Sequence, residues 1–354
     1  MSKIHFEYLL NDSLNFYLEK TASFNDKSSV LICRQSEEKF FEKFSEQFNI
    51  KFDRIIFDEI SGESINVFDN DKNYFFSNNV ITDEIYKNLI TKKIDERQIY
   101  IGPTQDAYFD LYPKKNVIYE NIEKLNETYY LLADDKSRRT FLQIITRLCL
   151  PYQYHYFYET ADDPQYFPKE FSFRDDEVFL DAGVCDGQNI FEFVECVHSN
   201  YKYIYGIEAD EDNFNVSKHN LKDINGLELI KGALFSKSGE KLFFRSSRMT
   251  GRKGNARVQN DGDILVSSVA GDSLKYSPTF IKMDIEGSEK DALIGLKETI
   301  KSQSPKLAVC IYHFQRDFWE ITLLIKKLNP QYNLMIRNHE RLFTLLESVC
   351  YAYV

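Results

Sequence analysis

The stretch that most constrains the fold of this chain is residues 178–187, V-F-L-D-A-G-V-C-D-G. Its apolar start is typical of a buried parallel strand, and an apolar-periodic segment at 190–197 follows the two glycines. Strand, glycine turn and helix in that order form the first crossover of a doubly wound α/β sheet. Such sheets bind ligands above the carboxyl ends of their strands, so the sequence predicts a binding site at this turn.

The spacing of the glycines indicates which ligand the turn accepts. Gly183 lacks a Cβ and lets a ligand approach the backbone, and Gly187 lies where the helix begins. A dinucleotide-binding turn has the pattern G-x-G-x-x-G, whereas here Asp181 takes the place of the first glycine. A carboxylate repels a pyrophosphate and suits a cationic ligand, such as the amino group and sulfonium of S-adenosylmethionine. An ordinary strand-to-helix turn without a ligand is the alternative interpretation.

A second acid lies at the distance that a nucleoside site requires. The segment Y-I-Y-G-I-E-A at 203–209 predicts the next strand, which ends at Glu208, about 20 residues after Gly187. An acid at this strand end is placed to accept hydrogen bonds from both ribose hydroxyls. The third predicted strand, at 227–236, contains Ala233, whose small side chain suits a site beside a flat adenine ring.

Charged side chains alternate at the end of the next predicted strand, F-I-K-M-D-I-E-G. Lys282, Asp284 and Glu286 share one side of an extended chain, and charges on a buried strand are costly unless they pair or bind something. The following strand, K-L-A-V-C-I-Y-H, delivers His313 to the same rim of the sheet. For this histidine a structural role and contact with a substrate both stay open.

Composition limits the kinds of partner that the protein can bind and the cellular compartment in which it is expected. With a net charge of −11, binding of nucleic acid through a basic face is not expected. No apolar run approaches the ~18 residues that span a membrane, and residues 1–20 do not resemble a signal peptide. The six scattered cysteines form no C-x-x-C pair, which indicates reduced thiols in a cytoplasmic protein.

The chain is expected to fold as two α/β units joined by a helical segment. Strands are predicted at 28–33, 54–57 and 98–102, and helices at 37–48 and 82–92. The turn after the first strand has no glycine, so residues 1–120 are assigned to packing, oligomerisation or partner recognition. Residues 121–168 are predicted to be a mainly helical connector and lid, and residues 169–354 to be the catalytic domain.

Two segments are candidates for covering the pocket. Residues 163–168, D-P-Q-Y-F-P, predict a rigid turn, in which Tyr166 either covers the nucleotide edge of the pocket or packs between domains. Residues 246–257 contain Arg248 and Arg252 in an acidic chain. This segment is either a solvated loop or a mobile cover that meets a phosphate- or carboxylate-bearing substrate.

These motifs resemble the FkbM family of S-adenosylmethionine-dependent methyltransferases. The segments that carry the resemblance are 178–187, 205–213, 231–234 and 280–289, and I-K-x-D-x-E-G-x-E is the most specific pattern among them. The resemblance covers about residues 166–350. It implies a seven-stranded, Rossmann-like class I methyltransferase sheet with an antiparallel last strand. It also implies O-methylation of a hydroxyl, often on a sugar, a glycan precursor or a secondary metabolite.

The resemblance also implies roles for individual residues. The cofactor-binding residues would be Asp181, Gly183 and Gly187 for the methionine part, Glu208 for the ribose, Ala233 near the adenine, and Asp284 at the reacting end. We hypothesise that Asp284 or His313 removes the proton of the acceptor. No metal is expected, because carboxylates at positions i and i+2 are a weak ligand signal.

The remaining roles concern the acceptor and the rival functions. Lys282 or Glu286 is expected to orient a small-molecule or glycan acceptor. An NAD(P)-dependent oxidoreductase also needs an acid on the ribose, but Asp181 and the missing glycine triplet argue against it. A non-catalytic S-adenosylmethionine-binding or assembly protein, including a homo-oligomer, is the other alternative. A divalent metal held by Asp284, Glu286 and His313 is likewise left as an alternative.

Overall fold

The computed structural model of the protein divides into two compact units. It describes residues 5–21, 28–48, 51–57, 71–77, 89, 91, 93–94, 98–102, 115–149, 164–245, 257–258, 264–339 and 347–354. The predicted helix at 82–92 falls almost entirely outside these residues, as do Arg248 and Arg252. Within the described residues, no helix combines the length and the apolar character that crossing a membrane requires.

The second unit is built on a seven-stranded sheet in the order β14-β15-β13-β12-β5-β6-β7. The strands are β5 (Val178–Ala182), β6 (Tyr203–Glu208), β7 (Leu227–Lys231), β12 (Phe280–Met283), β13 (Lys306–Cys310), β14 (Asn333–Asn338) and β15 (Ser348–Tyr353). Only β15 runs antiparallel to its neighbours, β13 and β14. The predicted α/β fold with a mostly parallel sheet is confirmed.

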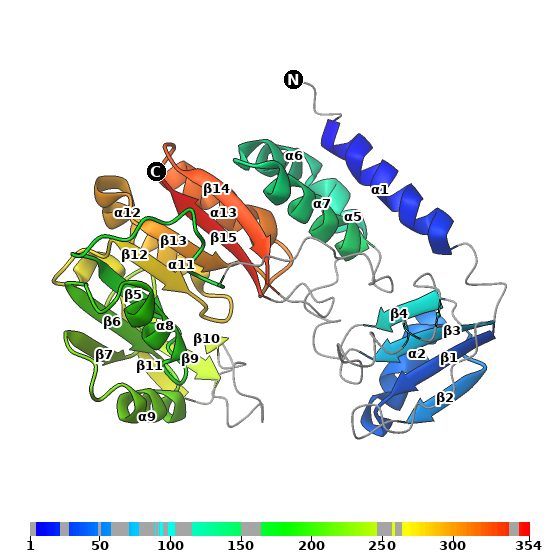
Figure 1. Ribbon diagram of the computed structural model, residues 1–354, viewed down its shortest axis with the longest axis horizontal. Helices are drawn as coiled ribbons and strands as arrows, with labels where there is room; N and C mark the ends of the chain where they lie inside the picture. The colour runs from blue at the N-terminus through cyan, green and yellow to red at the C-terminus, as the bar shows by residue number, and fades with distance from the viewer. Residues whose placement is uncertain are drawn as a thin grey trace. The chain divides into compact units, whose positions relative to one another are not determined.

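Strand β5 lies inside this sheet next to its middle strand, β12, where the strand order reverses (Figure 1). From β5 the chain moves outward through β6 and β7, and it later returns to β12 on the other side of β5. The loops after β5 and β12 therefore part from each other at the carboxyl end of the sheet, which opens a crevice there. The glycine turn thus occupies the position at which such sheets bind ligands.

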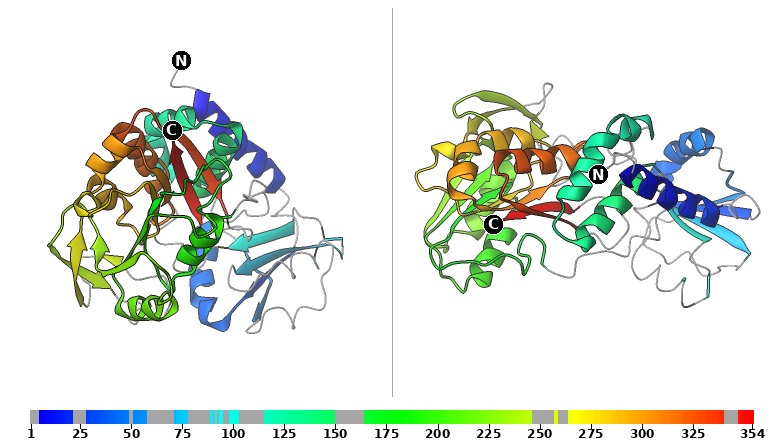
Figure 2. Two further views of the ribbon diagram at one scale, coloured as in Figure 1. Left: turned by 60° about the vertical axis from the view of Figure 1, so that its left-hand side comes forward. Right: turned by 90° about the horizontal axis from the view of Figure 1, so that it is seen from above.

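The helices of this unit cover both faces of the sheet. They are α8 (Gln188–Cys196), α9 (Glu211–Asn220), α11 (Glu289–Ile294), α12 (Lys297–Gln303) and α13 (Asp317–Leu328). Crossovers between parallel strands are right-handed, so helices that connect strands in opposite directions lie on opposite faces. Accordingly, α8 lies on one face and α12 and α13 on the other (Figure 2).

Aromatic rings fill the core between β5, β12 and α8. Phe179 stacks on Phe280 with ring centroids 4.8 Å apart, and Phe193 of α8 lies 4.4 Å from Phe179. Phe167 and Phe171, from the segment before β5, pack edge-on against Phe280. The segment that the sequence predicts to be a turn before the sheet is therefore anchored to its core.

A four-stranded sheet follows β7 in the order β10-β9-β11-β8. Its strands are β8 (Ala233–Leu234), β9 (Lys241–Arg245), β10 (Arg257–Val258) and β11 (Ile264–Val269). Strand β9 pairs antiparallel with β10 and β11, which confirms that 241–245 belongs to a hairpin. Because β8 pairs with β11, the chain leaves the large sheet at Gly232 and brings an apolar wall to the pocket.

The first unit contains a parallel sheet in the order β2-β1-β3-β4. Its strands are β1 (Ser28–Cys33), β2 (Arg54–Phe57), β3 (Lys72–Ser77) and β4 (Ile99–Gly102), and η2 (Gln35–Glu37) and α2 (Glu38–Phe48) follow β1. Sequence analysis did not predict β3. Leu31, Phe41, Phe75 and Tyr100 are members of the buried cluster that joins α2 to the sheet.

Helices complete this unit. They are α1 (His5–Thr21), α5 (Lys115–Glu120), α6 (Ile122–Leu131) and α7 (Asp135–Cys149), of which α1 was not predicted. Phe6 of α1 contacts Tyr129 and Phe141, with ring centroids 5.4 and 5.8 Å away. The predicted helical character of 120–150 is confirmed over α6 and α7.

Candidate active site

An open pocket of about 750 Å³ lies at the carboxyl ends of β5, β6 and β12. Five residues that the sequence singles out line it: Gly183, Glu208, Ala233, Asp284 and Glu286. The loops of three neighbouring strands therefore bring together residues that are up to about a hundred positions apart in the chain.

Glu208 joins the tips of β5 and β6. Its side chain is 6% exposed, and its carboxylate accepts hydrogen bonds from the backbone N–H of Cys185 (2.9 Å) and of Asp210 (2.7 Å). Cys185 adopts a left-handed conformation with φ of 54°, which turns its N–H toward Glu208. Burial raises the pKa of Glu208 to about 7, although the two N–H groups oppose this. The acid predicted to hold a ribose is thus oriented at the pocket wall.

A wall of small and apolar side chains faces this acid. Ala233 and Leu234 come from β8, Phe244 from β9 and Val258 from β10, and all of them line the pocket. A flat purine ring requires such a wall, and an acid such as Glu208 suits its ribose. The lining has the small and apolar side chains that the sequence predicts for an adenosine site, and binding of adenosine there stays a prediction.

Asp181 and Lys282 form a buried ion pair next to the pocket. Lys282 Nζ lies 3.0 Å from Asp181 Oδ1 and donates a hydrogen bond to the carbonyl oxygen of Gly183 at 2.8 Å. Their side chains are 1% and 0% exposed. Burial raises the pKa of Asp181, whereas the pKa of Lys282, which burial lowers, is raised overall by Asp181 and Asp284. The pair holds the glycine turn, and direct contact with a ligand stays a prediction for both residues.

Both glycines of the turn adopt backbone conformations that other residues rarely accept. Gly183 has φ of 82°, and a Cβ there would lie 1.9 Å from the carbonyl oxygen of Asp284. Gly187 has φ of 95° and caps α8, and a Cβ there would lie 2.8 Å from the Leu221 side chain. The space beside Gly183, which sequence analysis assigned to a ligand, admits the backbone of the neighbouring loop. This close approach brings Asp284 to the pocket.

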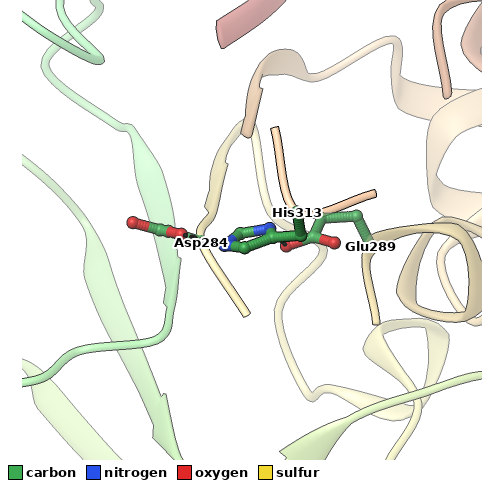
Figure 3. A group of neighbouring side chains, drawn as sticks. All are labelled: Asp284, Glu289 and His313. Carbon is green, nitrogen blue, oxygen red and sulfur yellow. Dashed lines mark ion pairs between the residues drawn. The ribbon is translucent and has the colours of Figure 1, made fainter. Parts of the chain in front are cut away.

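His313 lies among three carboxylates at the tips of β12 and β13. Its Nε2 is 3.3 Å from Asp284 Oδ1 and 3.4 Å from Glu286 Oε2, and its Nδ1 is 3.0 Å from Glu289 Oε1 (Figure 3). The pKa of His313, which burial lowers, is raised well above its ordinary value by Glu289 and Asp284. His313, Asp284 and Glu286 therefore meet, as the sequence predicts.

Asp284 is also held by two tyrosines. The hydroxyls of Tyr166 and Tyr312 donate to its carboxylate at 3.2 Å. Burial raises the pKa of Asp284, but His313 outweighs it and the pKa lies below its ordinary value. Tyr166 is 4% exposed, and its ring centre lies 5.2 Å from Lys282 Nζ. The structure thus places Tyr166 against Asp284 rather than over the nucleotide edge.

Sequence analysis did not assign two residues of this cluster to the site. Glu289 was assigned to a helix start, although it is the last acid of the I-K-x-D-x-E-G-x-E pattern. It is fully buried, and its Oε1 also accepts a hydrogen bond from the N–H of Ile285 at 3.0 Å. Tyr312 precedes His313 in the chain, and this adjacency was its only signal. Arg248 and Arg252 lie outside the described residues.

Comparisons with known proteins agree with this geometry. Residues 181–351 match the model described as "Methyltransferase FkbM domain". The hexuronic acid methyltransferase AglP of Haloferax volcanii is 24% identical over 175 residues, which are 47% of this chain and 70% of that protein. The crystal structure of methyltransferase FkbM from Methylobacillus flagellatus KT is similar with a TM-score of 0.65 and 18% identity, over 99% of this chain and 100% of that chain.

Proposed function

We propose that the protein is an O-methyltransferase of the FkbM family of S-adenosylmethionine-dependent methyltransferases, whose domain model matches residues 181–351. The acceptor is the hydroxyl of a sugar, a glycan precursor or a secondary metabolite. S-adenosylmethionine, the expected cofactor of this family, supplies the methyl group when bound. The observation that carries the proposal is that Glu208 and Asp284 line one pocket, with His313 3.3 Å from Asp284.

Methyl transfer to oxygen is an in-line displacement, so positioning supplies most of the catalysis. Glu208 would accept hydrogen bonds from the ribose hydroxyls of the bound cofactor, and Ala233 and Phe244, which also line the pocket, would contact its adenine. Asp181 and Lys282 hold the glycine turn that bounds the methionine end of the pocket. These groups fix the cofactor so that an acceptor oxygen can approach to about 3 Å from the methyl carbon.

The acceptor hydroxyl must also lose its proton as the new bond forms. Asp284 or His313 takes up this proton, and Glu286 orients the acceptor from the pocket wall. Asp284 lines the pocket directly, whereas His313 is not among the lining residues and lies 3.3 Å from Asp284 and 3.4 Å from Glu286. Tyr166 and Tyr312 support the reaction by holding the carboxylate of Asp284.

We further propose that the acceptor carries an acidic group. The name of the Haloferax volcanii relative specifies a hexuronic acid as the substrate of that protein. In this chain, Arg248 and Arg252 supply positive charge in the segment that follows β9 in the sequence. Phe244 of β9 lines the pocket. Guanidinium groups bind carboxylates through paired hydrogen bonds, so these two arginines are assigned to the acidic group. The net charge of −11 makes a nucleic-acid acceptor unsuitable.

The test is transfer of labelled methyl groups to a panel of neutral and acidic sugars, followed by identification of the labelled atom. The expected product is a methyl ether on a sugar that carries a carboxylate. Turnover of nicotinamide cofactor without methyl transfer would refute the proposal in favour of an oxidoreductase. Cofactor binding without transfer to any acceptor in a cell extract would favour the assembly function.

A further inference from the structure

Two buried side chains in the acid–histidine cluster have polar atoms without a hydrogen-bond partner. In the described part of the chain, Glu289 Oε2 and both ring nitrogens of His313 make no hydrogen bond of acceptable geometry. Their side chains are 0% and 7% exposed. The carboxylates near His313 are close enough for ionic contact but lie off the directions that its nitrogens prefer. Buried polar atoms of this kind indicate a missing partner, such as an ion.

The arrangement of the cluster suits one ion. Asp284, Glu289 and His313 each present one ligand atom, and these atoms all lie within 4.8 Å of one another (Figure 3). Mg²⁺ and Ca²⁺ bind oxygen at about 2.0–2.6 Å, so ligands on opposite sides of one ion are about 4–5 Å apart. Asp284 faces Nε2 of His313 and Glu289 faces its Nδ1, so a single cation that binds all three residues requires the imidazole to turn out from between the two carboxylates.

The charges of the cluster also favour a bound cation. Three carboxylates, those of Asp284, Glu286 and Glu289, surround the single imidazole of His313. Lys282, on β12 two residues before Asp284, is held by Asp181 of the neighbouring strand and by a carbonyl oxygen. Glu289 is fully buried, whereas Asp284 and Glu286 are 26% and 25% exposed, and a buried carboxylate is costly unless a cation or hydrogen bonds compensate it.

We propose that Asp284, Glu289 and His313 bind one divalent cation at the edge of the cofactor pocket. Two carboxylates favour a hard cation, and the imidazole is accepted by Mn²⁺ among such ions. The sequence left Asp284, Glu286 and His313 as an alternative metal set, and a metal-free centre was favoured because carboxylates at positions i and i+2 are a weak ligand signal. The left-handed conformations of Glu286 and Gly287 reverse the chain and bring Glu289 of α11 into the set.

The role of the cation rests on the proposed function, although its binding does not. Next to Asp284, the cation is placed to coordinate the acceptor oxygen and to stabilise the negative charge that develops as the proton leaves. His313 is then a ligand rather than the base, and Asp284 or water receives the proton.

The test is Mn²⁺ binding to the full chain after removal of metals with a chelator, followed by electron paramagnetic resonance without cofactor or acceptor. We expect one ion per chain and binding at least about 10-fold weaker in both Glu289→Gln and His313→Gln. Asp291→Asn, which removes another carboxylate of α11, should bind like wild type. Circular dichroism verifies that each variant is folded.

Failure of this proposal is distinct from failure of the proposed function. No stoichiometric binding at millimolar Mn²⁺, or equal binding by wild type and both ligand variants, overturns the cation site and leaves methyl transfer untouched. Stoichiometric Mn²⁺ binding that both variants weaken supports the site even if no hydroxyl is methylated. Full transfer by chelator-treated protein would refute the catalytic role of the ion.

Discussion

Replacing Lys282 by methionine should destabilise the seven-stranded unit by about 3–5 kcal/mol, because it leaves a buried carboxylate without its cation. Lys282 Nζ lies 3.0 Å from Asp181 Oδ1, and the two side chains are 1% and 0% exposed. Water cannot replace the ammonium at this depth without opening the junction of β5 and β12. The substitution also removes the hydrogen bond to the carbonyl oxygen of Gly183.

Urea unfolding followed by tryptophan fluorescence measures this loss in the unit concerned. The chain has a single tryptophan, Trp319, which is buried in α13 of the seven-stranded unit. Its emission therefore reports the unfolding of this unit. By thermal unfolding the same loss corresponds to a melting temperature lower by roughly 6–20 °C, at about 2–4 °C per kcal/mol for a unit of this size.

A matched substitution at an exposed lysine shows how much of the lost stability comes from breaking a buried ion pair and how much from removing any lysine. Lys290 pairs with Glu320 at 2.7 Å, but these side chains are 41% and 24% exposed, so Lys290→Met should cost at most about 1 kcal/mol. The double variant Asp181→Asn/Lys282→Met should recover most of the loss, because no buried charge is left. If Lys282→Met costs no more than Lys290→Met, the reasoning about the buried pair is wrong.

Three further outcomes are expected. Glu208 has a pKa of about 7 in the folded protein, above its ordinary value of 4.5. Its protonation should therefore add about 3 kcal/mol to the free energy of unfolding below pH 4.5, and this stabilisation should be lost as the pH rises through 7. Urea unfolding of wild type and Glu208→Gln between pH 4.5 and 8 checks this, and parallel pH profiles would contradict it. Gly183→Ala should lower the free energy of unfolding by more than about 2 kcal/mol, because the added Cβ meets the carbonyl oxygen of Asp284. Gly239→Ala is the control for backbone strain alone, since Gly239 has a similar φ but no atom within 4 Å of the added Cβ. Equal losses of stability in the two variants would show that the Asp284 carbonyl is not the obstacle. Asp284→Asn and His313→Ala should each lower methyl transfer by about 10²–10⁴-fold while calorimetry still detects cofactor binding, and full rates in both would exclude them from the chemistry.

Most strands of the large sheet could be predicted from sequence because their signals are local. The apolar run at 178–180 and the segment F-I-K-M at 280–283 are each followed by an acid and a glycine, and β5 and β12 form there. Strand β3 and helix α1 were missed, because neither is bounded by a recognised turn. For Tyr166 the sequence left open a cover of the pocket and packing between domains, because its burial against Asp284 depends on strands far away in the chain.

The sequence alone determined the glycine turn, the two acids at positions 181 and 208 and the strand-end group at 282–286, because strand periodicity and short spacings encode them. Only the tertiary structure decided their partners. Asp181 faces Lys282 because β5 pairs with β12 in that register, and Glu289 reaches His313 because the chain reverses at Glu286. Contacts between residues distant in the chain depend on strand order and on positive φ angles, and no spacing within one segment specifies either.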